Sequence, residues 1–130
     1  MNLDWLAKFS DPYLKTKIGQ GVFLGGIILG MVAKYQVKNG DKVDAAPIFK
    51  QIMFGKMQRR DLLQHLSRVP DLLRAYDIPY KNCFQQLAGK GGDLLLSQNK
   101  EMGVDGNFIF SVAFLNAQEY FWRIFTKSEA

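Results

Sequence analysis

Hydrophobic residues recur along most of the chain every three or four positions, which is the spacing of side chains on one face of an α-helix. Alternating apolar and polar residues, which would indicate β-strands, extend over only a few positions at a time. The pattern predicts an all-α protein, a compact bundle of about five to six helices. The expected helices are residues 3–9, 13–37, 44–55 (capped by Asp44), 59–76 with a division at Pro70, a helix that opens at Pro79, and 107–127.

Two glycine-rich stretches, residues 89–92 and 103–107, interrupt this pattern. Glycine favours turns over helix interiors, so we expect a helix–helix turn at the first stretch and a turn before the last helix at the second. No linker, repeat or low-complexity tract divides the chain, and 130 residues are too few for two independent cores. We therefore expect a single domain over residues 1–130.

The longest apolar stretch is the uncharged run 18–33. Four of its five glycines form two i,i+4 pairs, Gly21 with Gly25 and Gly26 with Gly30, which lie roughly 140° apart around a helix. Each pair makes a flat strip that a neighbouring helix can approach closely. Helix-interior glycines destabilise a helix by about 1 kcal/mol each relative to alanine, and close packing can offset this cost. We predict a central, Gly-rich helix buried in the bundle.

A membrane anchor is the alternative interpretation of this run. A spanning helix needs about 20 apolar residues. The run is shorter, is diluted by glycine and contains Gln20. Glycine pairs of this spacing also occur between membrane helices, so a peripheral membrane protein anchored by residues 21–33 is a less favoured hypothesis. The N-terminal residues lack a secretory signal pattern, and the single cysteine, Cys83, cannot form an internal disulfide. We expect no membrane partner and a cytoplasmic location.

Basic residues are unevenly distributed. The chain has 17 Lys and Arg against 12 Asp and Glu, a net charge of +5. Segment 34–60 holds seven basic and two acidic residues, so it accounts for the whole excess. A concentrated positive surface indicates a polyanionic partner such as nucleic acid or anionic lipid, and a solvated basic surface without a partner is the alternative.

Particular basic residues are candidates for contacts with a phosphate backbone. Lys34 and Lys38 are one helical turn apart, where like charges repel, which favours a counter-charge from outside the chain. Basic residues spaced along helices can follow phosphates without reading bases. The predicted nucleic-acid-binding residues are Lys34, Lys38, Lys56, Arg59, Arg60 and Arg68.

No pattern typical of catalysis is found. The only histidine, His65, has no cysteine or carboxylate at metal-ligand spacing, and we expect it to be on the helix surface or half-buried. Cys83 has apolar neighbours, which predicts a buried side chain and not a nucleophile. The Gly-Lys-Gly-Gly stretch lacks the phosphate-loop pattern and follows a helix. We expect no enzymatic activity, no cofactor and no metal.

Aromatic residues are frequent near the C-terminus. They could stack on bases, but their helical spacing favours a core face. The residues expected in the core are Phe110, Phe114, Ala117, Phe121 and Phe125, with Tyr120 and Trp122 at its rim.

A resemblance to a known family rests on three segments: VFLGGIILGMVAKYQ, PIFKQIMFGKMQRRDLLQHLSRVPDLLRAY and FIFSVAFLNA. Together they resemble the C-terminal helical part of the large subunit of type I-B CRISPR Cascade complexes. In related systems this part is also made alone, as the small or belly subunit, by internal translation initiation. The similarity covers roughly residues 15–118 and contains no catalytic signature.

The resemblance implies a non-catalytic subunit, present in more than one copy per complex, beside the backbone and large subunits. Such subunits help to hold the heteroduplex of guide RNA and target DNA, and the displaced DNA strand, when the R-loop forms. R-loop formation is nearly balanced energetically, so modest backbone contacts can favour it. The family's motif positions are mainly structural and assign no specific contact. A helical protein–protein interaction module without nucleic-acid contact is the alternative.

Overall fold

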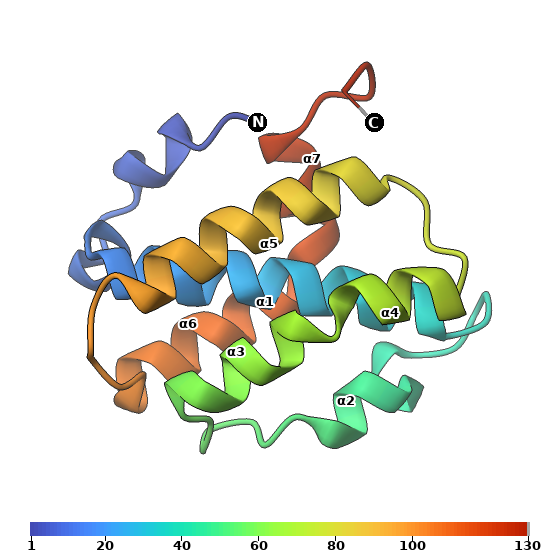
Figure 1. Ribbon diagram of the computed structural model, residues 1–130, viewed down its shortest axis with the longest axis horizontal. Coiled ribbons are helices and arrows are strands. Elements are labelled where there is room, and N and C mark those ends of the chain that lie inside the picture. Colours follow the sequence, from blue (N-terminus) through green and yellow to red (C-terminus); the bar gives the residue numbers. More distant parts are fainter. Residues whose placement is uncertain (130) are drawn as a thin grey trace.

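The computed structural model describes residues 1–129, and this part of the chain is helical without any strand (Figure 1). The all-α prediction is confirmed, with seven α-helices in the described part and not five to six. The helices are α1 (Lys17–Gln36), α2 (Pro47–Gln51), α3 (Arg59–Ser67), α4 (Val69–Ala75), α5 (Lys81–Leu96), α6 (Gly103–Leu115) and α7 (Ala117–Ile124), with 3-10 helices η1 (Asp4–Lys8), η2 (Pro12–Lys15) and η3 (Val43–Ala45).

Helix α1 is the centre of the bundle. It packs mainly against α5 and α6, which lie along different sides of it (Figure 1). The hydroxyl of Thr16 caps its start by accepting a hydrogen bond from the Gly19 main-chain N–H at 3.0 Å. Every residue from Ile18 to Ala33 is buried except Gln20, which is half-buried. Although α1 is long and apolar enough to cross a membrane, 83% of its apolar window is buried inside the fold. The predicted central helix is confirmed.

The two glycine strips of α1 face different neighbours. A Cβ atom at Gly21 would lie 2.9 Å from the Leu95 side chain of α5. A Cβ atom at Gly26 would lie 2.8 Å from the main-chain oxygen of Phe110 in α6, and one at Gly30 would meet the Phe114 oxygen still more closely. Real Cβ atoms do not approach other atoms this closely, so the helices around α1 require glycine at these positions. The prediction of close approach on two sides is confirmed.

Both turns expected at glycine-rich stretches are wrong. Residues 89–92 lie inside α5, where Gly91 is buried and would place a Cβ atom 3.5 Å from that of Leu24. Burial of apolar residues before and after the stretch outweighs the weak helix propensity of glycine. In the second stretch α6 already begins at Gly103, whose φ of 62° suits glycine at the entry to a helix.

Several helix boundaries also differ from the prediction. The division within 59–76 lies at Arg68, because Pro70 is accommodated in the first turn of α4, where no N–H is required. The segment 44–55 contains only the short η3 and α2, and Asp44 lies within η3 and does not cap α2. The helix expected over 107–127 is interrupted at Asn116, which separates α6 from α7.

The core is one cluster of buried hydrophobic side chains around α1. The predicted aromatic core face is confirmed, since all five of its residues are buried, and Tyr120 and Trp122 are half-buried at the rim. The indole of Trp5 stacks on Tyr120 with ring centroids 5.7 Å apart, which fixes the N-terminal segment on α7. The burial predicted for Cys83 is also confirmed.

Candidate nucleic-acid interface

The outward face of α3 carries polar and basic side chains. The helix begins with a capping box, in which the Gln58 main-chain N–H donates to the Asp61 carboxylate at 2.9 Å. Leu62 and Leu66 are buried against the bundle. The side chains on the side of the helix away from these leucines point to solvent. The exposed residues on that side are Arg60, Gln64, Ser67 and Arg68.

Arg60 and Arg68 are neighbours on this face. Gln64 lines two shallow surface hollows, one shared with Arg60 and the other shared with Arg68. In the described part of the chain the ion pairs are those of the Met1 amino group with Glu129 and of Asp71 with Arg74. Neither guanidinium group of this face therefore forms an ion pair with a carboxylate of residues 1–129, although Asp61 lines the same hollow as Arg60, and both can meet an external anion.

His65 lies half-buried beside Arg68, as expected for this residue. Burial lowers the pKa of its imidazole, and the positive charge of Arg68 lowers it further, against an opposing effect of Asp61. Its Nδ1 atom is buried and has no hydrogen-bond partner among residues 1–129. The imidazole is consequently neutral at pH 7, and the charge of this face comes from the two arginines.

Arg59 has a different environment from Arg60. Its guanidinium donates hydrogen bonds to the main-chain oxygens of Leu95 at 3.0 Å and Gln98 at 2.8 Å, and to the side chain of Asn99 at 3.0 Å. These carbonyls lie at the C-terminal end of α5, where helices leave acceptors without internal partners. Arg59 therefore connects the start of α3 to the end of α5, a role that the sequence alone did not indicate.

The predicted lysines lie away from the hollows of α3. Lys34 is exposed in the last turn of α1 and lines a hollow with Phe114 and Gln118, next to α6 and α7. Lys38 is exposed beyond the end of α1, so the proposed one-turn spacing of Lys34 and Lys38 on a helix is wrong. Lys56 is exposed in the loop that leads into α3. Of the six predicted residues, the structure places Arg60 and Arg68 together on one surface.

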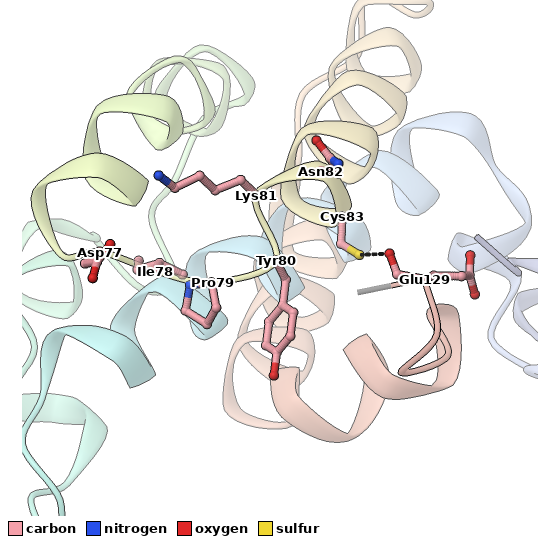
Figure 2. Close-up of a pocket in the computed structure, with 8 residues that line it drawn as sticks. All are labelled: Asp77, Ile78, Pro79, Tyr80, Lys81, Asn82, Cys83 and Glu129. Atoms are coloured by element: carbon pink, nitrogen blue, oxygen red, sulfur yellow. Dashed lines mark hydrogen bonds between the residues drawn. The ribbon is translucent and has the colours of Figure 1, made fainter.

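A separate pocket lies at the start of α5 (Figure 2). Figure 2 shows the Cys83 thiol directed at the main-chain oxygen of Glu129, 3.7 Å away, and the Lys81 side chain extending away from it. Burial raises the pKa of the Cys83 thiol, and the nearby charge of Glu129 raises it further. The thiol is therefore protonated at neutral pH and is not an activated nucleophile. Within residues 1–129, no three His, Cys, Asp or Glu side chains gather as metal ligands would.

Comparison with protein families adds the decisive observation. A model of the C-terminal domain of CRISPR-associated protein TM1802 matches residues 3–128, nearly the whole chain. The chain belongs to this family. The resemblance to a CRISPR-associated protein is thereby confirmed, and the match indicates a role in CRISPR defence. No curated protein and no solved structure matches the chain. The matched span of this CRISPR-associated domain includes α1 to α7 and all six basic residues predicted to bind nucleic acid.

Two polar residues of this CRISPR-associated domain join the candidate surface although basic charge alone did not indicate them. Gln64 and Ser67 lie between Arg60 and Arg68 on the exposed face of α3. Amide and hydroxyl groups commonly donate to phosphate oxygens. Their i+4 and i+7 spacing from Arg60 was the signal in the sequence.

Proposed function

We propose that this CRISPR-associated domain acts as a non-catalytic small subunit of a Cascade-type effector complex and holds nucleic-acid backbones through the outward face of α3. The observation that carries the proposal is the pair Arg60 and Arg68, exposed and not paired with a carboxylate of residues 1–129, in a member of a CRISPR-associated family. The ligands would be the guide–target heteroduplex or the displaced strand, and the partners would be the backbone and large subunits.

The chemistry of this face suits contacts that are independent of base sequence. The two arginines are eight residues apart, about 12 Å along a helix, and one strand of a duplex rises only about 3.4 Å along its axis per phosphate, so the two guanidinium groups can meet different phosphates of the same strand. Arginine binds phosphate through a planar fork, and Gln64 and Ser67 can add neutral donors between the two charges. Since R-loop formation nearly balances one duplex against another, a few such contacts favour the open state.

Removal of the two charges tests the proposal. The double variant Arg60→Gln/Arg68→Gln should bind single-stranded DNA more weakly, and the slope of log affinity against log salt should fall in magnitude by about 1.4, because each phosphate contact with a single strand contributes about 0.7. The matched control is Arg74→Gln, because Arg74 is also exposed but already paired with Asp71. Binding should be measured with the isolated chain and with the assembled complex. An unchanged affinity and salt slope in both would contradict the assignment of α3.

A helical interaction module without nucleic-acid contact is the second candidate, and one observation favours it. Large apolar side chains are exposed on α6, where they cannot contribute to the core of this chain. In that case labelled single strands would not bind at any salt concentration, with or without partner subunits. The two functions can also coexist, since they use different surfaces.

A further inference from the structure

The chain contains one Asn-Gly pair, Asn39 and Gly40, in the connection between α1 and η3. Both residues are exposed, and Figure 1 shows this connection at the edge of the molecule. Asparagine is a chemically labile residue, because the next main-chain nitrogen can attack its side-chain carbonyl carbon. Glycine in the following position favours this attack, since it has no side chain to hinder the approach. The reactivity of the pair therefore depends on how firmly the fold holds it.

A single hydrogen bond closes the turn around this pair. The Asp41 N–H donates to the Lys38 main-chain oxygen at 3.0 Å, and Gly40 has a φ of 91°. Among residues 1–129, neither the Gly40 N–H nor the Asn39 amide makes a hydrogen bond, and a Cβ atom at Gly40 would meet no atom within 4 Å. An exposed hydrogen bond adds little net stability in water, so the turn can open while the helices on either side stay folded.

The other five asparagines lack this combination of features. Asn2, Asn99 and Asn116 are exposed, but the side chain of each makes a hydrogen bond within the fold. Asn82 lies in the first turn of α5, and Asn107 is buried. The residue that follows each of these five carries a side chain. Sequence and structure therefore both distinguish the Asn-Gly turn from every other asparagine of the chain.

We propose that Asn39 is a site of spontaneous modification, at which attack by the Gly40 main-chain nitrogen converts asparagine to a mixture of isoaspartate and aspartate. In the first step a bond forms between the Gly40 nitrogen and Asn39 Cγ, and the bond between Cγ and Nδ2 breaks. The Gly40 nitrogen loses its proton and the side-chain amide leaves as ammonia, which gives a cyclic succinimide. Water then opens the ring at one of its two carbonyls. Opening at Cγ gives aspartate, and opening at the main-chain carbonyl carbon gives isoaspartate.

The conversion changes the basic segment 34–60. Lys38 and Lys42 are exposed on either side of the pair in the sequence. The new carboxylate lowers the net charge of the segment from +5 to +4. Isoaspartate also lengthens the main chain of the turn by one carbon, so the hydrogen bond that closes the turn cannot keep its geometry. The surface around Lys38 therefore changes with the age of the molecule, whereas Arg60 and Arg68 on α3 are not affected.

Peptide mapping by mass spectrometry tests the proposal. The folded full-length chain is incubated at mildly alkaline pH beside a reference peptide of residues 34–44. We expect a mass increase of about 1 Da at Asn39, at least about tenfold faster than at Asn99, and labelling of the product by an isoaspartate methyltransferase. The rate should rise with pH, because the attacking nitrogen must lose its proton. If the peptide converts and the folded chain does not, the turn protects Asn39 and the proposal is wrong. Equal rates at Asn39 and Asn99 would also overturn it.

Two variants assign the reaction to this turn. Asn39→Gln should abolish the mass increase, because attack on the longer side chain would have to form a larger ring, which is slow. Asn82→Gln is the matched control, since Asn82 is also exposed, and it should leave the conversion rate at Asn39 unchanged. A mass increase of the same rate in Asn39→Gln would place the reaction elsewhere and contradict the proposal. No step involves Arg60 or Arg68, so the result is independent of nucleic-acid binding by α3.

Discussion

The Arg59 guanidinium donates a hydrogen bond of 2.8 Å to the main-chain oxygen of Gln98, so the first residue of α3 holds the chain just beyond the end of α5. The next residue, Arg60, is exposed and makes no ion pair among the described residues. Two adjacent arginines therefore have different roles, one in stability and one available for a ligand.

This difference can be measured directly. Arg59→Ala should lower the free energy of unfolding by about 1.5–3 kcal/mol, because it leaves the carbonyls of Leu95 and Gln98 without a charged donor. Arg60→Ala should change it by less than about 0.5 kcal/mol, as is usual for surface substitutions. Urea denaturation of both variants checks the prediction. Equal losses in the two variants would contradict it.

The glycine contacts of α1 predict opposite effects at two buried positions. Gly26→Ala should destabilise the fold by about 1–3 kcal/mol, since its Cβ atom would lie 2.7 Å from that of Ala113. Gly91→Ala, the control in the facing helix α5, meets its nearest atom at 3.5 Å and should be neutral or stabilising by up to about 1 kcal/mol. Thermal denaturation measures both. A stable Gly26→Ala protein would show that α6 can move away from α1.

Asn107 is the buried polar residue of α6, and its loss should be severe. Its side chain accepts from the Met57 N–H at 2.8 Å and donates to the Met57 oxygen at 3.1 Å, which fixes the loop before α3. Asn107→Ala should cost about 2–4 kcal/mol, because two buried main-chain groups lose their partner. Asn116→Ala is the control, since the Asn116 side chain donates to the Val112 main-chain oxygen at 2.9 Å but is exposed. Chemical denaturation with similar losses in both variants would contradict this role.

The environment of His65 makes the stability of the fold depend on pH. Its folded-state pKa is lowered by burial and by Arg68, so protonation favours the unfolded chain, where the pKa is about 6.5. The stability that the neutral His65 imidazole contributes is fully present above about pH 6.5, and it is lost as the pH falls from there to the lowered pKa of His65 in the folded state. His65→Gln should remove this change. NMR titration of the single histidine gives the folded pKa directly, and a value above 6.5 would contradict the prediction.

The sequence predicted those features that depend on local periodicity. The two strips of α1 followed from glycine spacing and the helical turn angle, and the neighbours that fill them were found in α3, α5 and α6. The core face of Phe110, Phe114 and Phe121 followed in the same way. Such patterns are predictable because residues three and four apart share a face whatever lies opposite.

The features that depend on distant partners were missed. Glycines at 89–92 indicated a turn, but packing of Gly91 on Leu24 keeps α5 continuous. The role of Arg59 depends on carbonyls 36 and 39 residues further along the chain. The sequence predicted six basic residues as one set and did not separate Arg60 and Arg68 from Lys34, which lies beside α6 and α7. Tertiary packing decides which charged side chains lie together on one surface.

The contacts of α1 also restrict how chain length can vary in this family. One residue inserted between Gly25 and Gly26 would rotate the rest of the helix by about 100° and direct bulky side chains at the Phe114 carbonyl in place of Gly30. A deletion would rotate it by the same angle in the other sense. Insertions and deletions should therefore fall outside α1, for example in the connecting segment 37–42, while α1 keeps a constant length.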